Sequence, residues 1–378
     1  MLSYVIPTRD RPERLRATLD ALADLGPHEA VGGAEVIVVD NASLEVPILP
    51  RVLRSGVPVL HIRLPRNDGA AARNEGVRAA SAACEWVVML DDDSAPTDTA
   101  FVEGLARQPA DVAAVSADIW LPERPGRAPI RESGGLPEVF VGCGVALRRR
   151  TFLDLGGYDA ALGYYAEEYD LAARMLLDGR RVAFDPAFVV VHAKEARHRD
   201  MDTILARLVR NNGWVAQRYA PARRRIDELR ESRRRYRRIA RAEEALAGYG
   251  RGLRELRATI RHQLRRPMPE ALWDRFTGLA AARRTLLAAY AEAPFATAAI
   301  VDEGKNAWAV ARALGELGVR LTADNDDAEA LVIGTLSPGP MLDSFERRLH
   351  GRRPGARRVI MPWTPGAGLP VEPLRRAA

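Results

Sequence analysis

Three consecutive carboxylates stand out because of where they lie in the sequence. Asp91, Asp92 and Asp93 directly follow the apolar run 86–90, which has the composition of a buried strand. Adjacent carboxylates at the end of a buried strand are costly unless a cation or a hydrogen-bond network compensates their charge. Hard cations such as Mg²⁺ or Mn²⁺ bind through one or two carboxylates plus substrate phosphates. The cluster therefore favours a divalent metal site, and a solvated acidic turn that caps a helix is the alternative.

The elements that must position this cluster alternate between strands and helices. Short β-rich runs occupy residues 2–8, 35–41, 59–64 and 86–90, and residues 11–25 carry apolar side chains at helical spacing. This alternation predicts an α/β fold with a mostly parallel sheet covered on both faces. Ligands of such sheets bind where the strands end. We therefore expect one crevice to collect the polar residues that follow three of the strands, namely Pro7, Thr8, Arg9, Asp40, Asn41 and the aspartate cluster.

The rest of the chain divides by composition. From about residue 200 to residue 294 the pattern is that of long Arg-rich helices, and after residue 294 a small-scale α/β alternation returns. We expect an α/β domain at 1–215, an Arg-rich helical region at 216–295 and a small, Rossmann-like α/β domain at 296–378. The turn 302–307 lacks the three-glycine fingerprint, and Asp302 and Glu303 would repel a pyrophosphate. A structural, oligomerising or acceptor-positioning module is expected there.

The charge of this 378-residue chain is regional. Its formal net charge is +6, but residues 222–266 hold sixteen arginines against six acidic residues, so the remainder is net negative. The arginines alternate with glutamates and no aromatic stacking series accompanies them, so no nucleic-acid partner is expected. A solvated helical face is the simplest interpretation, and peripheral contact with an anionic membrane or a lipid-linked acceptor is the alternative.

Cysteine usage and hydropathy suggest where the chain works. The two cysteines, Cys84 and Cys143, are far apart and have no metal-binding spacing, which fits a reducing compartment. The N-terminus has no basic segment before its apolar run, and no apolar stretch reaches about 18 residues. We expect a cytoplasmic protein, with the inner face of the membrane as a peripheral location.

Five motifs in order resemble the family 2 glycosyltransferases. The matching segments are residues 4–8, 38–43 and 87–96, followed by 142–148 with 156–159, and then by Glu167-Glu168-Tyr169-Asp170-Leu171. The resemblance covers roughly residues 2–195. It implies a GT-A fold, a nucleotide-diphosphate sugar as donor, and Mn²⁺ or Mg²⁺ as cofactor.

The resemblance implies a role for each matching position. Residues expected to surround the donor are Pro7, Thr8, Arg9, Asp40, Asn41, Asn67, Gly69, Arg73, Asp91, Asp92, Gly142 and Gly144. Within this set, Asp40 would accept a hydrogen bond from the base and Arg73 would hold the nucleotide end. Asp91 and Asp93 form the family's DxD motif, with Asp93 as the direct metal ligand. His192, at the end of an apolar run, takes the position of a third ligand, and Lys194, Arg197 and Arg199 would neutralise the diphosphate or open the next helix as solvated charges.

The catalytic base is implied by the acidic motif before a predicted helix. Glu168 takes the base position, where the family usually has Asp, so Glu167 and Asp170 stay as alternatives. A Glu can perform the same proton transfer because its unperturbed pKa is close to that of Asp. The implied reaction is a displacement at the anomeric carbon with inversion. Two other functions stay open: a nucleotidyltransferase, disfavoured because residues 7–12 contain no glycine, and a non-catalytic nucleotide-sugar binding subunit.

The sequence leaves the destination of the sugar open. The acceptor is a glycan, a glycolipid or a small molecule, and bacterial surface polysaccharide biosynthesis is one of the pathways that fit. A homo-oligomer is equally compatible with the chain.

Overall fold

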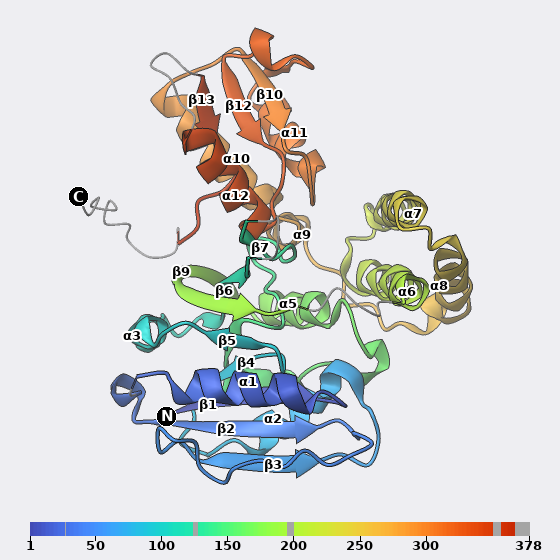
Figure 1. The fold of residues 1–378 in the computed structure, drawn as a ribbon. Coiled ribbons are helices and arrows are strands. Elements are labelled where there is room, and N and C mark those ends of the chain that lie inside the picture. The colour runs from blue at the N-terminus through green and yellow to red at the C-terminus, as the bar shows by residue number, and fades with distance from the viewer. Residues whose placement is uncertain (27, 124–127, 195–199, 351–356, 367–378) are drawn as a thin grey trace, which may run out of the picture.

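The computed structural model describes residues 1–26, 28–123, 128–194, 200–350 and 357–366. A nine-stranded sheet dominates the N-terminal part, with the order β3-β2-β1-β4-β8-β6-β9-β5 and with β7 paired to β6 (Figure 1). Its strands are β1 (Leu2–Thr8), β2 (Ala34–Asp40), β3 (Val59–Arg63), β4 (Trp86–Met89), β5 (Ser94–Pro96), β6 (Val112–Leu121), β7 (Ile130–Arg131), β8 (Val145–Arg148) and β9 (Arg181–His192).

Strand directions change across this sheet. The strands β3, β2, β1 and β4 are parallel, and β6 and β9 are parallel to each other, whereas β8 runs antiparallel between β4 and β6. The short edge strands β5 and β7 are also antiparallel to their neighbours. The predicted α/β fold with a large, mostly parallel sheet is confirmed, and its antiparallel pairs lie in the second half.

Both faces of the first strands are buried, which explains their continuous apolar sequences. Val5 and Val39 face α2 (Ala72–Ala79), while Tyr4 and Val38 face α1 (Pro12–Ala23). The helix α1 begins with Pro12 at its first position, where a missing backbone N–H costs nothing. Further helices of this part are α3 (Ala100–Ala106), α4 (Arg149–Asp154) and α5 (Glu167–Leu177). The helices thus cover a sheet whose polar strand ends are left for the site.

The Arg-rich region consists of helices, as predicted, but they form two groups. The helices are α6 (Met201–Tyr219), α7 (Arg225–Ala242), α8 (Leu246–Thr259), α9 (Glu270–Phe276) and α10 (Leu279–Glu292). The first three pack on one another beside α5, whereas α9 packs against α5 and α10, and α10 packs against α11 (Ala307–Glu316) (Figure 1). The expected boundary at 215/216 falls inside α6, which continues until the break before Pro221.

A second sheet follows in residues 296–350 and 357–366, which we call the C-terminal unit. Its order is β11-β10-β12-β13 and all pairs are parallel. The strands are β10 (Thr297–Val301), β11 (Arg320–Leu321), β12 (Ala330–Ile333) and β13 (Arg358–Ile360), and α12 (Pro338–His350) lies between the last two in sequence. The helix α12 packs against β6 and β7 of the large sheet. Among the residues described, no helix has the length and apolar character needed to cross a membrane.

Candidate active site

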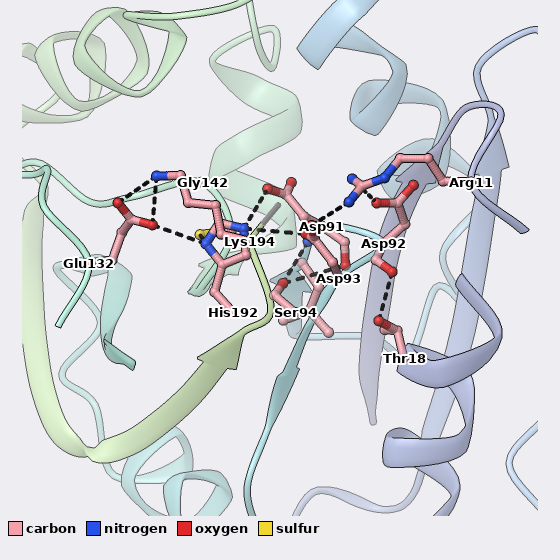
Figure 2. A network of polar contacts seen from close by, with 12 residues as sticks. Arg11, Thr18, Asp91, Asp92, Asp93, Ser94, Glu132, Gly142, His192 and Lys194 are labelled. Carbon is pink, nitrogen blue, oxygen red and sulfur yellow. Dashed lines mark hydrogen bonds and ion pairs between the residues drawn. The ribbon is translucent and has the colours of Figure 1, made fainter. Parts of the chain in front are cut away.

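The aspartate cluster lies at the carboxyl end of β4, and the end of β1 reaches it as predicted. Thr8 Oγ1 donates to Asp92 Oδ2 at 2.9 Å. Arg11, in the turn after β1, donates to Asp92 Oδ1 at 2.6 Å and to Asp93 Oδ2 at 2.5 Å (Figure 2). Arg11 therefore balances part of the charge that three consecutive carboxylates create.

The three aspartates have different environments. Asp93 is buried and its Oδ1 has no hydrogen-bond partner among the described residues, whereas the Asp91 side chain is 38% exposed and receives a hydrogen bond from Arg73. Burial raises the pKa of Asp92 to about 7 in spite of Arg11 and Thr8. Burial also acts to raise the pKa of Asp93, but the proximity of His192 and Arg11 holds it at about 2. Asp93 is thus an anion whose Oδ1 accepts no hydrogen bond and makes an ion pair with His192.

His192, at the end of β9, faces this oxygen. Its Nε2 lies 3.3 Å from Asp93 Oδ1 and 4.0 Å from Asp91 Oδ2, while its Nδ1 lies 3.1 Å from Glu132 Oε2 (Figure 2). Burial acts to lower the pKa of His192, but its acceptors Asp93 and Glu132 raise it overall. The ring therefore carries a proton that a metal ion would displace on binding.

These residues fit a divalent cation. Two ligand atoms about 2.1 Å from a hard cation, at right angles to each other, lie about 3 Å apart, close to the separation of Asp93 Oδ1 and His192 Nε2. Cys143 offers a further ligand atom in a group with Asp91 and His192. However, its Sγ lies 3.5 Å from His192 Nδ1, whereas Asp91 and Asp93 face Nε2 on the other side of the ring. The side that faces Asp91 and Asp93 presents oxygen ligands, which suit Mn²⁺ or Mg²⁺.

The predicted nucleoside end lies at the carboxyl ends of β1 and β2. Asp40 is fully buried, and its Oδ1 accepts from Ser43 N at 2.8 Å while its Oδ2 has no hydrogen-bond partner in the described parts of the chain. Pro7 pairs with Val39 in the sheet, and Arg9 is half exposed beside Asp10. Arg63 Nε lies 3.7 Å from Asp40 Oδ2, beyond hydrogen-bond distance, so an N–H of a nucleobase would supply the hydrogen bond that this buried oxygen lacks.

Asn41 connects this end to the next loop. Its Oδ1 accepts from Asp68 N at 2.8 Å, and its Nδ2 donates to Gly69 O at 3.1 Å. Asn67 Oδ1 accepts from Gly69 N at 2.9 Å. Both asparagine side chains are thus engaged in holding the loop, and the loop backbone is what remains to face a donor.

Arg73 lies beside the aspartate cluster. It is buried, and its Nη2 donates to Leu90 O at 3.1 Å and to Asp91. The guanidinium therefore holds Asp91 in place. Its contact with the nucleotide end of a donor stays a prediction.

The acidic pair expected to supply the base begins α5. Glu167 is buried with Oε2 unpartnered within the described structure, and Glu168 Oε1 accepts from Gly142 N at 3.3 Å. A Cβ atom on residue 142 would lie 3.0 Å from Glu168 Oε1, so glycine permits this approach. Burial raises the pKa of both glutamates, and the charge of Glu168 raises that of Glu167 further. Glu168, which has a donor, is the member that ionises first.

Asp170, the third candidate for the base, does not fit that role. It is buried and accepts from Arg174 Nε at 2.9 Å, from Arg218 Nη1 at 2.7 Å and from the Tyr219 hydroxyl at 2.7 Å. A carboxylate with three donors and almost no exposure cannot meet an acceptor hydroxyl. Asp170 instead anchors α5 to the end of α6. Glu167 and Glu168 remain as the two candidates for the catalytic base.

The chain enters α5 through strained backbone. Tyr165 and Ala166 both have positive φ, 72° and 68°, although neither is glycine. Such conformations cost about 1–3 kcal/mol each and persist where the surroundings enforce them. Asn211 of α6, itself fully buried, donates to Tyr165 O at 2.7 Å and to Leu162 O at 2.9 Å. Helix α6 therefore fixes the loop that aims Glu167 and Glu168.

Comparison with known proteins shows what the first part of the chain is similar to. The family model described as glycosyl transferase family 2 matches residues 3–153. This segment, which includes the aspartate cluster, is thus similar in sequence to the family 2 glycosyltransferases. An uncharacterized protein, y4gI, from Sinorhizobium fredii is 33% identical over 138 residues, which are 32% of this chain and 14% of that protein. The chain thus spans about a seventh of the length of this relative.

Solved glycosyltransferases resemble the chain more distantly. GalNAc-T7 with UDP, GalNAc and Mn²⁺ shares 14% identity at a TM-score of 0.49, over 69% of this chain and 57% of that one. A mannosyltransferase from Pyrobaculum calidifontis, in complex with GDP-Man and Mn²⁺, shares 18% sequence identity at a TM-score of 0.44. The match covers 78% of this chain and 81% of that one. S. aureus TarS 1–349 in complex with UDP-GlcNAc shares 16% sequence identity at a TM-score of 0.48. The match covers 78% of this chain and 87% of that one.

The segment that the family model matches ends before several residues that complete the site. Glu167, Glu168 and His192 follow the matched segment. Gly144, inside it, accepts through its carbonyl from Ala117 N at 2.9 Å and joins β6 to the strand β8. Arg197 and Arg199 lie outside the described residues.

Three residues at the site were missed in the sequence. Arg11 contacts the aspartate cluster and Glu132 contacts His192, but neither belongs to a motif that marks a metal site. Lys305 comes from the C-terminal unit, and its Nζ lies 4.3 Å from the centre of the Tyr169 ring. Burial lowers the pKa of Lys305 to about 8, and the nearby charge of Glu168 opposes this shift. Lys305 could not be found from the sequence because it is far from Glu168 along the chain and no local pattern links the two residues.

Proposed function

We propose that this chain transfers a sugar from a nucleotide-diphosphate sugar to an acceptor hydroxyl, with metal assistance and inversion at the anomeric carbon. The observation that carries the proposal is the buried Asp93 Oδ1, which accepts no hydrogen bond and forms an ion pair with His192 Nε2 at 3.3 Å, within the segment that resembles family 2 glycosyltransferases. It marks a place for a cation at the strand ends. The acidic pair Glu167–Glu168 supplies the catalytic base.

Donor binding is assigned to the two buried carboxylate oxygens that accept no hydrogen bond. Asp40 Oδ2 is available to the base, and Asp93 with His192 and Asp91 would hold Mn²⁺ or Mg²⁺. When bound, the cation neutralises charge that develops on the leaving diphosphate. Arg11 and Arg73 hold the aspartates in position before the donor arrives.

The proton transfer is assigned to Glu168. In its ionised form the carboxylate takes the proton of the acceptor hydroxyl as the oxygen attacks the anomeric carbon. Gly142 N–H orients Glu168, and Lys305 contributes a positive charge nearby that favours the ionised form. A single displacement of this kind inverts the anomeric configuration.

The two rival functions are less well supported. A nucleotidyltransferase would need a glycine-rich triphosphate loop after the first strand, and residues 9–11 of this chain are Arg-Asp-Arg. A non-catalytic binding subunit would need a missing base, whereas Glu168 lies in the base position with its pKa raised above the ordinary value by burial. We therefore favour catalysis.

We propose the cellular compartment and membrane contact of the enzyme from its free cysteines and its exposed charges. Cys84 and Cys143 are both free and buried, which supports a reducing, cytoplasmic compartment. Helix α7 exposes Arg234, Arg237 and Arg241, a basic face that suits peripheral contact with an anionic membrane. The acceptor, whether glycan, glycolipid or small molecule, and any homo-oligomer stay open.

The proposal is tested by donor hydrolysis. A panel of UDP-, GDP-, dTDP- and CMP-sugars is incubated with the chain, with and without Mn²⁺. We expect hydrolysis of one diphosphate donor that needs Mn²⁺ and is lost in Asp93→Ala. The matched control Asp154→Ala removes a half-exposed carboxylate that pairs with Arg150, and it should keep the activity. Absence of turnover and of binding across the panel would favour the non-catalytic alternative.

A further inference from the structure

A short segment links His192 to the C-terminal unit. It begins with Arg131 at the end of β7 and includes Glu132, whose side chain is 5% exposed. Glu132 Oε2 lies 3.1 Å from His192 Nδ1, and both carboxylate oxygens accept from Lys194 Nζ at 2.8 and 2.9 Å (Figure 2). Glu132 is therefore fixed on the side of the imidazole that points away from the aspartates.

The neighbouring residue points the other way, into α12. Arg131 Nη1 donates to Asp343 Oδ1 at 2.9 Å, and its Nη2 donates to Glu346 Oε1 at 2.8 Å. The backbone N of Arg131 also donates to Asp343 Oδ2 at 2.9 Å. On the sheet, Arg131 Nε donates to Asp118 at 2.9 Å, and its guanidinium lies 4.1 Å from the centre of the Trp120 ring.

The backbone of the segment is held against the start of α12 as well. Gly134 N donates to Ser337 Oγ at 2.9 Å, and Ser337 Oγ donates in turn to Gly134 O. Gly339 lies against the segment so closely that an added Cβ would stand 2.4 Å from Glu132 O. Helix α12 is therefore in direct contact with the backbone that carries Glu132.

We propose that Glu132 is a positioning residue for the metal ligand His192, and that α12 of the C-terminal unit holds Glu132 in place. The inference rests on the proposed function, because it concerns the cation site assigned there. When Glu132 accepts a hydrogen bond from Nδ1–H, Nε2 is the ring nitrogen left to bind a cation beside Asp93. Carboxylates in this position raise the basicity of a ligating histidine and fix its orientation. The C-terminal unit thereby becomes part of the metal site.

A purely structural role for Glu132 is the competing explanation. Glu132 would then serve only to neutralise Lys194 and to join two loops. The two roles differ in what they predict for metal affinity. A positioning carboxylate affects Mn²⁺ binding even where the fold is intact, whereas a structural one changes thermal stability and leaves the affinity of the folded protein unchanged.

The test is direct titration of the full chain with Mn²⁺, followed by electron paramagnetic resonance of free Mn²⁺, with thermal melting recorded for every variant. We expect Glu132→Ala to bind Mn²⁺ about 10–100-fold more weakly. Glu132→Gln, which keeps a neutral acceptor, should lose less. The double variant Asp343→Asn/Glu346→Gln, which frees Arg131 from α12, should also weaken Mn²⁺ binding. The control Glu316→Gln breaks exposed ion pairs with Arg283 and Arg312 in the same C-terminal unit and should leave the affinity unchanged.

The outcomes separate the inference from the proposed function. Unchanged Mn²⁺ affinity in folded Glu132→Ala would overturn the positioning role while the metal site stands. Loss in Glu132→Ala with full affinity in the α12 double variant would overturn the part assigned to the C-terminal unit. No Mn²⁺ binding by the unaltered chain would overturn the cation site itself, and the inference with it.

Discussion

The neighbouring glutamates at the start of α5 should respond very differently to the same substitution. Glu168→Gln removes the proton acceptor but keeps the side-chain size and its contact with Gly142 N–H. Loss of a general base lowers kcat by about 10²–10⁴-fold, which corresponds to about 2.7–5.4 kcal/mol of barrier. Burial and the neighbouring charge of Glu168 raise the pKa of Glu167 well above the ordinary value, which favours its neutral form. Glu167→Gln keeps the size of the side chain and should keep kcat within about tenfold, below the smallest effect of a lost base.

The assay is the rate of transfer or donor hydrolysis at saturating donor and Mn²⁺, measured from pH 5 to pH 9. Because the base must be ionised, activity should rise with pH through the pKa of Glu168, and burial places this limb above the ordinary value for glutamate. The limb should persist in Glu167→Gln and disappear in Glu168→Gln. A loss of 100-fold or more in Glu167→Gln, with Glu168→Gln nearly intact, would refute the assignment and transfer the role to Glu167.

Three further changes test other parts of the account. Lys305→Met should shift the acidic limb of the same pH profile upward, because the charge that lowers the pKa of Glu168 is removed; an unshifted limb would separate Lys305 from the site. Asp40→Asn should weaken binding of the donor nucleotide in calorimetry by about 1–3 kcal/mol, the cost of losing a buried hydrogen-bond acceptor, and unchanged affinity would place the base elsewhere. Phe101→Ala should lower the free energy of unfolding by about 3–5 kcal/mol, because Phe101 stacks on Phe188 at 4.2 Å in the core; a loss below 1 kcal/mol in denaturant titration would contradict that packing.

The first half of the fold could be predicted because its strands are buried on both faces. Parallel strands such as β1, β2 and β4 appear as unbroken apolar runs, and their predicted bounds lie within one residue of the observed ones. The strand β6 was not predicted, and β9 was recognised only by the run at its end. Pairing of these two strands is irregular, with register shifts beside Ala117 and Asp118, so no simple period marks them.

The candidate site shows the same division between local and long-range information. Carboxylates at strand ends could be expected to meet, because the carboxyl ends of parallel strands share one edge of the sheet. The contacts of Arg73 with Asp91 and of Glu132 with His192 depend on side-chain directions that spacing does not determine. Arg131 and Glu346 are 215 residues apart, and one sequence gives no sign that they touch. The role of the C-terminal unit could therefore emerge only in three dimensions.

The most direct test of the central claim is a proton NMR time course of the donor that the chain consumes. The anomeric proton of the donor and that of the first released or transferred sugar are followed together, with and without Mn²⁺. We expect Mn²⁺-dependent loss of the donor signal, release of nucleoside diphosphate, and a first product of opposite anomeric configuration. Retained configuration would contradict the single displacement with Glu168 as base, and an unchanged donor signal for every nucleotide sugar would contradict the assignment of glycosyl transfer.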